Sequence, residues 1–167
     1  AEYVLPKRAW IMAYQAKSIQ ITGPGTIDGN ADAFIEKRGK VIHSMRAPVG
    51  GRSQYLERPF TIFLIDCPSV ELRDFTIDNP AFWALRLSGC DNANIYGIRI
   101  MTDMKVPNAD GIDIDRCENV VISNCHFETA DDCISVKSCS GTEVYGLTRN
   151  IIIEKCFFRT ASGAITL

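Results

Sequence analysis

The 167-residue chain has little of what marks several protein classes. No apolar run approaches the roughly 18 to 20 residues that span a bilayer, so we expect no membrane partner. The net charge is only −2, without the basic excess that is typical of a nucleic-acid-binding protein. Hydrophobic residues make up 46% and charged residues 23%, which excludes a disordered or fibrous chain. What remains is one domain of ordinary size with a hydrophobic core.

Histidine and closely spaced cysteines are also scarce. The sequence has two histidines and no Cys-x-x-Cys motif, which leaves little for a zinc site. Its seven cysteines are an odd number for a disulfide framework. We therefore expect no metal ion and no cofactor. Disulfides, or a metal site, are the alternative interpretation of the cysteines.

A short apolar segment recurs along the chain. Its copies occupy residues 70–77, 93–100, 120–127 and 151–158, with an earlier version at 19–27 that has one inserted residue. A second, alternating apolar segment follows each of the four, at 84–87, 111–114, 133–136 and 164–167. Alternation with period 2 is typical of strands with one buried face. A repeat of roughly 20 to 50 residues is typical of stacked coils.

These strands favour an all-β fold, a right-handed parallel β-helix, in which one chain forms a single-stranded solenoid of stacked coils. No stretch between the strands has convincing helical periodicity and capping. An antiparallel sandwich also has many short strands, but it predicts hairpin turns such as Asn-Gly, and none lies at the strand junctions. The sequence therefore predicts the β-helix.

The spacing of the cysteines supports this prediction. Cys67, Cys90 and Cys117 each lie three residues before a repeat, whereas Cys125 and Cys156 each lie five residues after the start of one. Equivalent positions in a solenoid stack about 4.8 Å apart. Because free cysteine behaves as a small buried hydrophobe, we expect these residues to form interior ladders.

Residues 31–58 interrupt the repeat. This insertion has an excess of Lys and Arg over Asp and Glu, in a chain that is slightly acidic as a whole. A long connection of this kind is usually functional or mobile, and a basic one could wall a groove and attract an anionic substrate. A solvated loop of mixed charge is the alternative. We expect one partial β-helix domain over residues 1–167 that includes this basic insertion loop.

Alignment of the second strands brings acidic residues to one level. Pairing 111–114 with 133–136 places Asp110 level with Asp132, and Asp131 lies one position earlier. These three side chains should converge on one solvent-facing patch where the two strands begin. The same columns hold Phe82 and Trp83 on the coil before, and Ser162 and Gly163 on the coil after.

Three carboxylates in one patch repel one another, which raises the pKa of at least one of them. Glycoside hydrolysis requires this composition, with a protonated carboxyl for the leaving oxygen and a carboxylate for the attacking water. The alternatives are a calcium site, which also uses several carboxylates, and a turn in which aspartates accept backbone amides.

Six motifs occur in order and at suitable spacing: Ile21-Thr-Gly-Pro-Gly-Thr-Ile-Asp-Gly29, Arg58-Pro59, Asn79-Pro-Ala-Phe-Trp83, Asn108-Ala-Asp-Gly-Ile-Asp113, Asp131-Asp-Cys-Ile-Ser-Val-Lys-Ser138 and Thr160-Ala-Ser-Gly-Ala-Ile-Thr-Leu167. With them the sequence resembles the family 28 glycoside hydrolases, the polygalacturonases and rhamnogalacturonan hydrolases of the pectin-degrading β-helix group. The resemblance covers nearly the whole chain.

The resemblance implies an inverting hydrolysis by three aspartates. Asp131 corresponds to the acid that protonates the glycosidic oxygen, and Asp110 and Asp132 correspond to the residues that share the nucleophilic water. The column register agrees, because it stacks Asp110 on Asp132 and sets Asp131 aside. The resemblance also implies an acidic polysaccharide or oligosaccharide as substrate, and a monomer that is secreted or periplasmic, with its leader outside this chain.

The chain departs from the family pattern in two important ways. The Gly-His-Gly motif of the family corresponds to Ala161-Ser-Gly163, so that Ser162 takes the place of the histidine, or Gly163 if the register shifts by one. Serine can hydrogen-bond a carboxylate or a sugar hydroxyl but does not titrate near neutrality. The Arg-x-Lys motif of the family would lie on coils after Leu167. We therefore expect a β-helix that is truncated at its C-terminal end.

Five further side chains are candidates for substrate binding: Asn108, Lys137, Ser162, Trp83 and Arg86. Trp83 could stack against a sugar ring, with core packing as an equal alternative. Arg86 and Lys137 could bind a uronate carboxylate. For Arg86, a surface salt bridge is the alternative.

The sequence thus predicts a hydrolase of glycosidic bonds in pectin-type polysaccharide, with a polygalacturonan or rhamnogalacturonan backbone. A β-helix that binds carbohydrate without cleaving it, or an inactive family member, is the rival hypothesis, because of the missing histidine and the missing coils. A calcium-dependent lyase on the same fold is the third.

Overall fold

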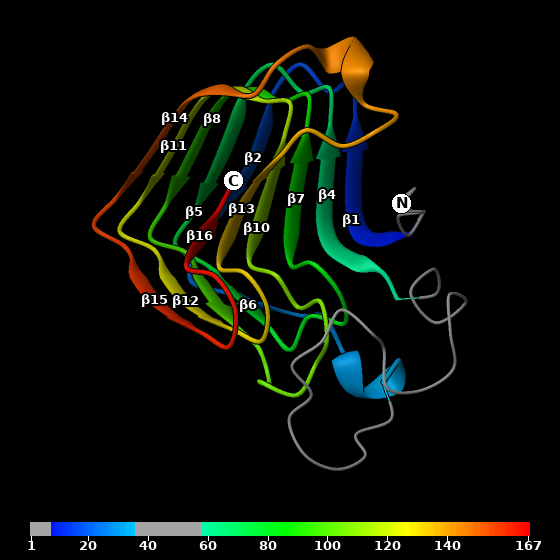
Figure 1. Ribbon diagram of the computed structural model, residues 1–167, viewed down its shortest axis with the longest axis vertical. Coiled ribbons are helices and arrows are strands. Elements are labelled where there is room, and N and C mark those ends of the chain that lie inside the picture. The colour runs from blue at the N-terminus through cyan, green and yellow to red at the C-terminus, as the bar shows by residue number, and fades with distance from the viewer. Residues whose placement is uncertain (1–7, 36–57) are drawn as a thin grey trace.

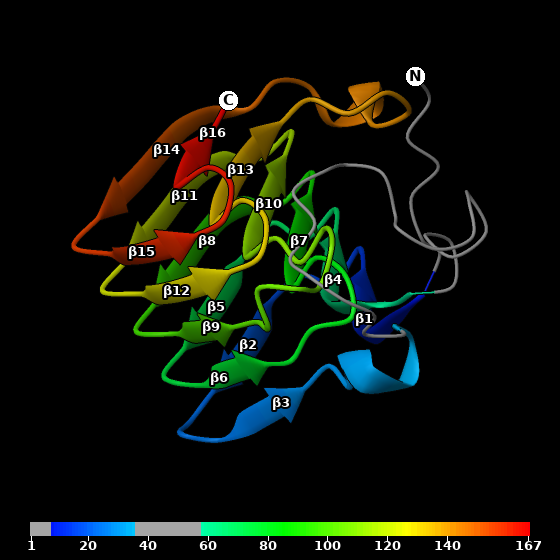
Figure 2. The same ribbon diagram turned by 60° about the horizontal axis from the view of Figure 1, so that its bottom comes forward.

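The computed structural model describes residues 8–35 and 58–167 of the chain. Its strands form three parallel sheets (Figures 1 and 2). The first sheet consists of β1 (Ala9–Tyr14), β4 (Phe60–Ile65), β7 (Leu85–Ser88), β10 (Ile112–Asp115), β13 (Ile134–Lys137) and β16 (Ile165–Thr166). The second consists of β2 (Ile19–Thr22), β5 (Val70–Arg73), β8 (Asp91–Tyr96), β11 (Glu118–Ser123) and β14 (Arg149–Glu154). The third consists of β3 (Thr26–Asp28), β6 (Thr76–Asp78), β9 (Arg99–Met101), β12 (His126–Thr129) and β15 (Phe157–Thr160).

Successive strands along the chain visit the three sheets in turn, so that each coil stacks on the previous one (Figure 2). This order confirms the parallel β-helix that the repeat predicts. Two short 3-10 helices, η1 (Ala31–Ala33) and η2 (Glu143–Tyr145), lie in connections outside the sheets. None of the helical segments among the described residues has the length and apolar character needed to cross a membrane.

The core lies between the three sheets and follows from the period-2 alternation. In β10, Ile112 and Ile114 point inward and are fully buried. They pair in register with Leu85 and Leu87 of β7, so that columns of branched side chains run along the axis. Burial of such a side chain stabilises the fold by about 1.5 to 3 kcal/mol.

All seven cysteines are free thiols, and the interior ladders predicted from their spacing are present. Cys67, Cys90 and Cys117 are fully buried, and the amide of Cys90 lies 3.3 Å from the sulfur of Cys117 on the next coil. Cys125 is also buried, whereas Cys156 is only half-buried. Burial raises the pKa of the Cys125 thiol to about 12, so this ladder residue is a weak nucleophile.

The corner between the second and third sheets has a fixed backbone conformation. In every coil its first residue has a positive φ: Gly23, Asp74, Gly97, Asn124 and Lys155. Asparagine also lines a separate column, at the start of β8, β11 and β14. There the side-chain amide of Asn150 donates to Asn119 at 3.1 Å, and that of Asn119 donates to Asn92 at 3.5 Å. The conformation of one coil is therefore repeated in the next.

Gly97 tests the importance of this corner. Its φ is 63°, and a Cβ added to it would lie 3.0 Å from a carboxylate oxygen of Asp74. We expect Gly97→Ala to lower the free energy of unfolding by about 1 to 2 kcal/mol in urea titrations. Gly25→Ala is the matched control, because Gly25 lies near the same corner of an earlier coil, without positive φ and with open space around its Cα. Equal losses in the two variants would contradict a role for the left-handed corner.

Candidate active site

Three aspartates lie together where β10 and β13 begin. Ile112 pairs with Ile134, and the amide of Gly111 donates to the carbonyl of Asp132 at 2.8 Å. This ladder places Asp110 level with Asp132 and Asp131 one position earlier, as the alignment of the strands predicts. The negative charges of Asp131 and Asp132 both act on Asp110.

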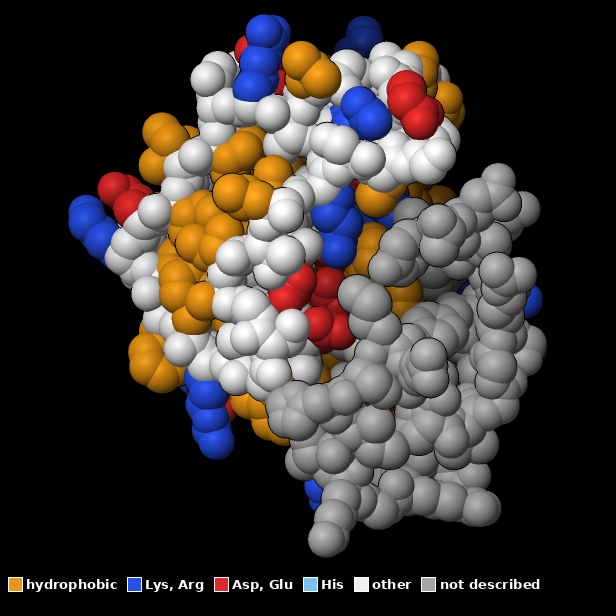
Figure 3. Space-filling model, in the orientation of Figure 1, with side chains coloured by type: hydrophobic (Ala, Val, Ile, Leu, Met, Phe, Trp, Pro, Cys, Tyr) orange, Lys and Arg blue, Asp and Glu red, His pale blue; other side chains and the backbone are white. Residues whose placement is uncertain are grey.

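The three carboxylates differ in exposure. Asp131 and Asp132 are half-buried, whereas Asp110 has a relative exposure of only 4%. The expectation that all three face solvent is therefore wrong for Asp110. In the space-filling view, acidic side chains gather near the centre of one face, beside Lys or Arg side chains (Figure 3).

Hydrogen bonds from two coils fix the Asp131–Asp132 segment. The hydroxyls of Thr129 and Thr160 both donate to the carbonyl of Asp131, at 2.6 and 2.5 Å. The hydroxyl of Ser162 and the amide of Gly163 donate to Oδ1 of Asp132, at 2.9 and 3.0 Å. Ser162 thus contacts a candidate catalytic carboxylate from the following coil.

Burial and charge raise the pKa values of the carboxyls at this site. Burial raises the pKa of Asp110 well above that of an ordinary aspartate, and the charge of Asp113 raises it further, while Lys137 lowers it. Burial also raises the pKa of Asp131, and the neighbouring charge of Asp132 adds to the effect. The site therefore has carboxyls that hold a proton at higher pH than an ordinary aspartate does.

Lys137 lies beside these carboxylates rather than free in solvent. Its Nζ atom is 3.0 Å from Oδ1 of Asp113 and 3.7 Å from Oδ2 of Asp110. It also lies 4.4 Å from the centre of the Trp83 ring, within the range of a cation–π contact. Burial lowers the pKa of Lys137, but the charges of Asp113 and Asp110 more than compensate, and the net shift is upward.

Trp83 is part of the core and not an open platform for a sugar. Its exposure is 5%, and its ring stacks on that of Phe82 with centroids 5.2 Å apart. Phe60, from the coil before, packs against both rings. Of the two interpretations of Trp83, core packing is the one that its burial supports.

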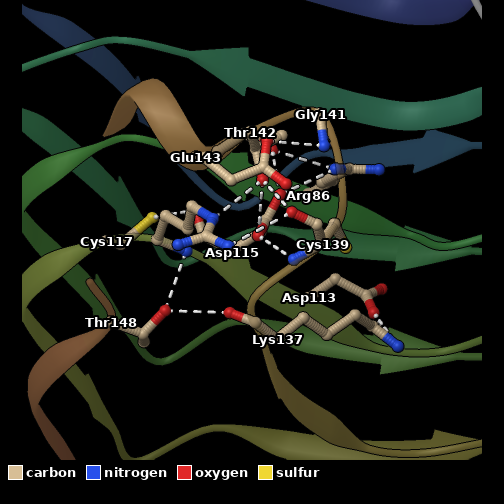
Figure 4. A network of polar contacts seen from close by, with 12 residues as sticks. Arg86, Asp113, Asp115, Cys117, Lys137, Cys139, Gly141, Thr142, Glu143 and Thr148 are labelled. Carbon is tan, nitrogen blue, oxygen red and sulfur yellow. Dashed lines mark hydrogen bonds and ion pairs between the residues drawn. The ribbon is translucent and has the colours of Figure 1, made fainter. Parts of the chain in front are cut away.

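Arg86 is not on the surface either, so a surface salt bridge is the wrong interpretation. Its side chain is 1% exposed and lies among aromatic rings. It donates to the hydroxyl of Ser88 at 2.9 Å. It also donates to Oδ2 of Asp115 at 2.9 Å (Figure 4). Because Arg86 is enclosed in this way, we leave it out of the proposed substrate contacts.

Asp115 joins this buried pair to the loop at residues 138–148. Its Oδ1 atom accepts from the amide of Cys139 at 2.9 Å and from the hydroxyl of Thr142 at 3.1 Å (Figure 4). Arg116 adds a hydrogen bond to the carbonyl of Gly146 at 2.6 Å. The loop is thus fastened over the carboxyl ends of β10 and β13, at the opposite end of these strands from Asp110, Asp131 and Asp132.

Asn108 is half-buried at the other end of β10 and has a positive φ of 55°. Its side-chain oxygen accepts from Arg58 at 3.4 Å, and Arg58 also donates to the carbonyls of Ala81 and Pro107. The described contact of Asn108 therefore supports the backbone next to Asp110.

The basic insertion is described only in part. Residues 36–57, which hold most of its charges, lie outside the described residues. Arg58, at its end, is 4% exposed and anchors the connection between β9 and β10. Among residues 8–35 and 58–167, no group of three or more His, Cys, Asp or Glu is arranged to hold a metal ion. The calcium interpretation gains no support from that part of the chain.

Asp113 is the site residue that the sequence interpretation missed. It belongs to the motif Asn108-Ala-Asp-Gly-Ile-Asp113, but no role is assigned to it there. The signal is available in the alternation of β10. Ile112 and Ile114 face the core, so Asp113 must face outward, level with Arg86 and Ser135 of the adjacent strands.

Comparisons with known proteins agree with the fold and with the motifs. The family model described as glycosyl hydrolases family 28 matches residues 2–164. The probable polygalacturonase of Vitis vinifera is 32% identical over 141 residues, which cover 81% of this chain and 26% of that protein. A probable polygalacturonase of Arabidopsis thaliana is 29% identical in an alignment of 182 positions that covers 95% of this chain and 36% of that protein. The chain spans about a quarter to a third of the length of these curated relatives.

Two solved structures have a similar architecture. A family 28 exopolygalacturonase of Yersinia enterocolitica aligns with a TM-score of 0.54 and 27% identity, over 68% of this chain and 20% of that one. A protein of Parabacteroides merdae aligns with a TM-score of 0.63 and 23% identity, over 90% of this chain and 61% of that one. The second similarity bears on the fold alone.

Proposed function

Because the chain belongs to family 28 of the glycosyl hydrolases, we propose that the whole protein hydrolyses glycosidic bonds in pectin-type polysaccharide, with a polygalacturonan or rhamnogalacturonan backbone. The observation that carries this proposal is the meeting of Asp110, Asp131 and Asp132 at the start of two adjacent strands. Asp110 is enclosed, whereas Asp131 and Asp132 are half-buried. Different surroundings of this kind allow side chains of one residue type to act as an acid and as a base.

The roles follow from exposure and from hydrogen bonding. The pKa values of Asp131 and Asp110 are both raised, so exposure separates their roles: half-buried Asp131 is open to the leaving oxygen and suits the acid, whereas Asp110 is enclosed. Asp132, oriented by Ser162 and Gly163, and Asp110 would activate the water on the opposite side of the sugar. This division of roles corresponds to an inverting mechanism.

The substrate class fits the charges of the site. Lys137 is 24% exposed and is the basic side chain that pairs with Asp110, so it could also approach a uronate carboxylate of the substrate. A long polysaccharide does not cross a membrane, and an enzyme that cleaves it acts outside the cytoplasm. We therefore infer a secreted or periplasmic protein, active as a monomer.

The direct test is release of reducing ends by the whole protein from polygalacturonate and, separately, from rhamnogalacturonan. We expect release from one of them and inversion of the anomeric configuration in the first product, followed by NMR. No release from either substrate, together with retained binding to it, would favour the carbohydrate-binding alternative. An unsaturated product absorbing in the ultraviolet, lost with a chelator, would favour the lyase.

Ser162 offers a smaller test of the same site. Ser162→Ala removes one of the two hydrogen bonds to Oδ1 of Asp132 but keeps the backbone donor at Gly163. We expect kcat/KM to fall about ten-fold, the equivalent of one hydrogen bond of about 1.4 kcal/mol to a charged group. Ser138→Ala, a substitution of an exposed serine, should leave kcat/KM unchanged. Equal values for both variants would remove Ser162 from the site.

A further inference from the structure

Asp113 is a fully buried carboxylate that the proposed roles do not use. A buried charge costs free energy unless it is paired. In the described part of the chain, the ion-pair partner of Asp113 is Lys137, whose Nζ atom lies 3.0 Å from Oδ1 (Figure 4). The equivalent residue on β13 is Ser135, so the fold itself does not require an acid in this column.

The position of the Lys137 ammonium is set by three groups. Asp113 holds it at 3.0 Å, Asp110 lies 3.7 Å away, and the Trp83 ring lies 4.4 Å away. Since the side chain is only 24% exposed, water screens these contacts weakly. One ammonium therefore serves two buried carboxylates.

The two partners of this ion pair act on Asp110 in opposite directions. The charge of Asp113 raises the pKa of Asp110, and the charge of Lys137 lowers it. The pKa of Asp113 is itself raised to about 7, mainly by burial, and Lys137 and Arg86 oppose this rise. The other charged groups that face Asp110 are Asp131 and Asp132, both of which raise its pKa.

We propose that Asp113 and Lys137 are positioning residues that together set the protonation state of Asp110. This inference depends on the proposed function, in which Asp110 acts as a base on water. A base must be deprotonated, so hydrolysis is lost as the pH falls through the pKa of Asp110. Lys137 extends the activity toward lower pH, and Asp113 limits that extension by holding the ammonium and repelling the charge on Asp110.

The test compares Asp113→Asn with Lys137→Gln over a range of pH. Loss of the Lys137 charge should move the acidic limb of the kcat/KM profile up by about one pH unit. Loss of Asp113 should move it down by a smaller amount, because Asp113 itself gains a proton as the pH falls through about 7. NMR titration of the aspartate carboxyl carbons measures the midpoint of Asp110 without any substrate. This midpoint should move down in Asp113→Asn and up in Lys137→Gln.

Two control variants separate this effect from a general change of charge or fold. Lys137→Arg keeps the positive charge and should keep the limb near its original pH. Asp78→Asn makes the same charge change as Asp113→Asn at the exposed end of β6 and should not move the limb. If Asp113→Asn does not fold, the Asp110 midpoint in Lys137→Gln still tests the inference, because the Lys137 side chain is partly exposed and its replacement should be tolerated.

An unchanged Asp110 midpoint in both variants, or a shift in the same direction in both, would overturn the inference whatever the activity. The proposed function can fail separately. If the midpoints shift as expected but the wild-type protein releases no reducing ends, the control of Asp110 stands and its use in hydrolysis fails.

Discussion

Asp132→Asn should lower kcat for the polysaccharide by about a hundred- to ten-thousand-fold, the usual contribution of a general acid or base. The asparagine keeps the size of the side chain and can still accept the hydrogen bonds from Ser162 and Gly163. It cannot take a proton from water. The measurement is the initial rate of reducing-end release by the whole protein at saturating substrate.

Asp78→Asn is the matched control for this substitution, because it makes the same chemical change on an exposed strand end. Its kcat should be that of the wild-type protein. Thermal unfolding of Asp132→Asn should remain close to wild type, since the shape of the site is preserved. A variant that keeps more than a tenth of the wild-type kcat would exclude Asp132 from the chemistry.

Asp115→Ala should destabilise the protein by about 3 to 5 kcal/mol, the cost of leaving one partner of a buried ion pair alone. The substitution leaves the guanidinium of Arg86 enclosed at 1% exposure, without its 2.9 Å contact to Oδ2. It also removes the acceptor for Cys139 and Thr142, which hold the loop at 138–148. The free energy of unfolding in urea measures the loss.

Glu118→Gln provides the comparison, since Glu118 pairs with Arg149 at 2.7 Å on the surface. The side chains of that pair are 30% and 63% exposed, and solvent screens such a pair. Its loss should cost less than about 1 kcal/mol. If Asp115→Ala costs no more than Glu118→Gln, the buried network makes no net contribution to stability.

The sequence was sufficient to predict the fold and the alignment of Asp110 with Asp132 on adjacent coils, because both depend on local periodicity. Ile112 and Ile134 are apolar members of alternating segments, and their pairing fixes Asp110 against Asp132 two residues earlier. A shift of one residue would turn every side chain of a strand to the other face. The register could therefore be aligned from the sequence.

Burial on the outer face of the first sheet could not be predicted in this way. Alternation sends Arg86 and Asp115 outward, where a residue is normally solvated, yet both are enclosed. Arg86 is covered by aromatic rings from other coils, and Asp115 is covered by the loop at 138–148. Contacts between a loop and distant strands carry no local periodicity.

The lengths of the connections reveal how the coils can vary. From β5 onward, each corner between the second and third sheets has two residues, as at 74–75 and 97–98. The connections before and after the first sheet are not constant. They range from two residues, at 89–90 and 116–117, to the long connections 102–111 and 138–148. All of the variation in connection length among these coils thus lies before or after the strands of the first sheet, next to which the aspartates lie.

The stacked coils accommodate such differences in length. At the corner between the second and third sheets, the first coil has one additional residue, at 23–25, and its strands still pair in register with those of the next coil. A residue added in a connection before the first sheet, such as 102–111, changes what borders the aspartates. The long connections beside the first sheet thus vary from coil to coil, while the three stacked sheets stay in register.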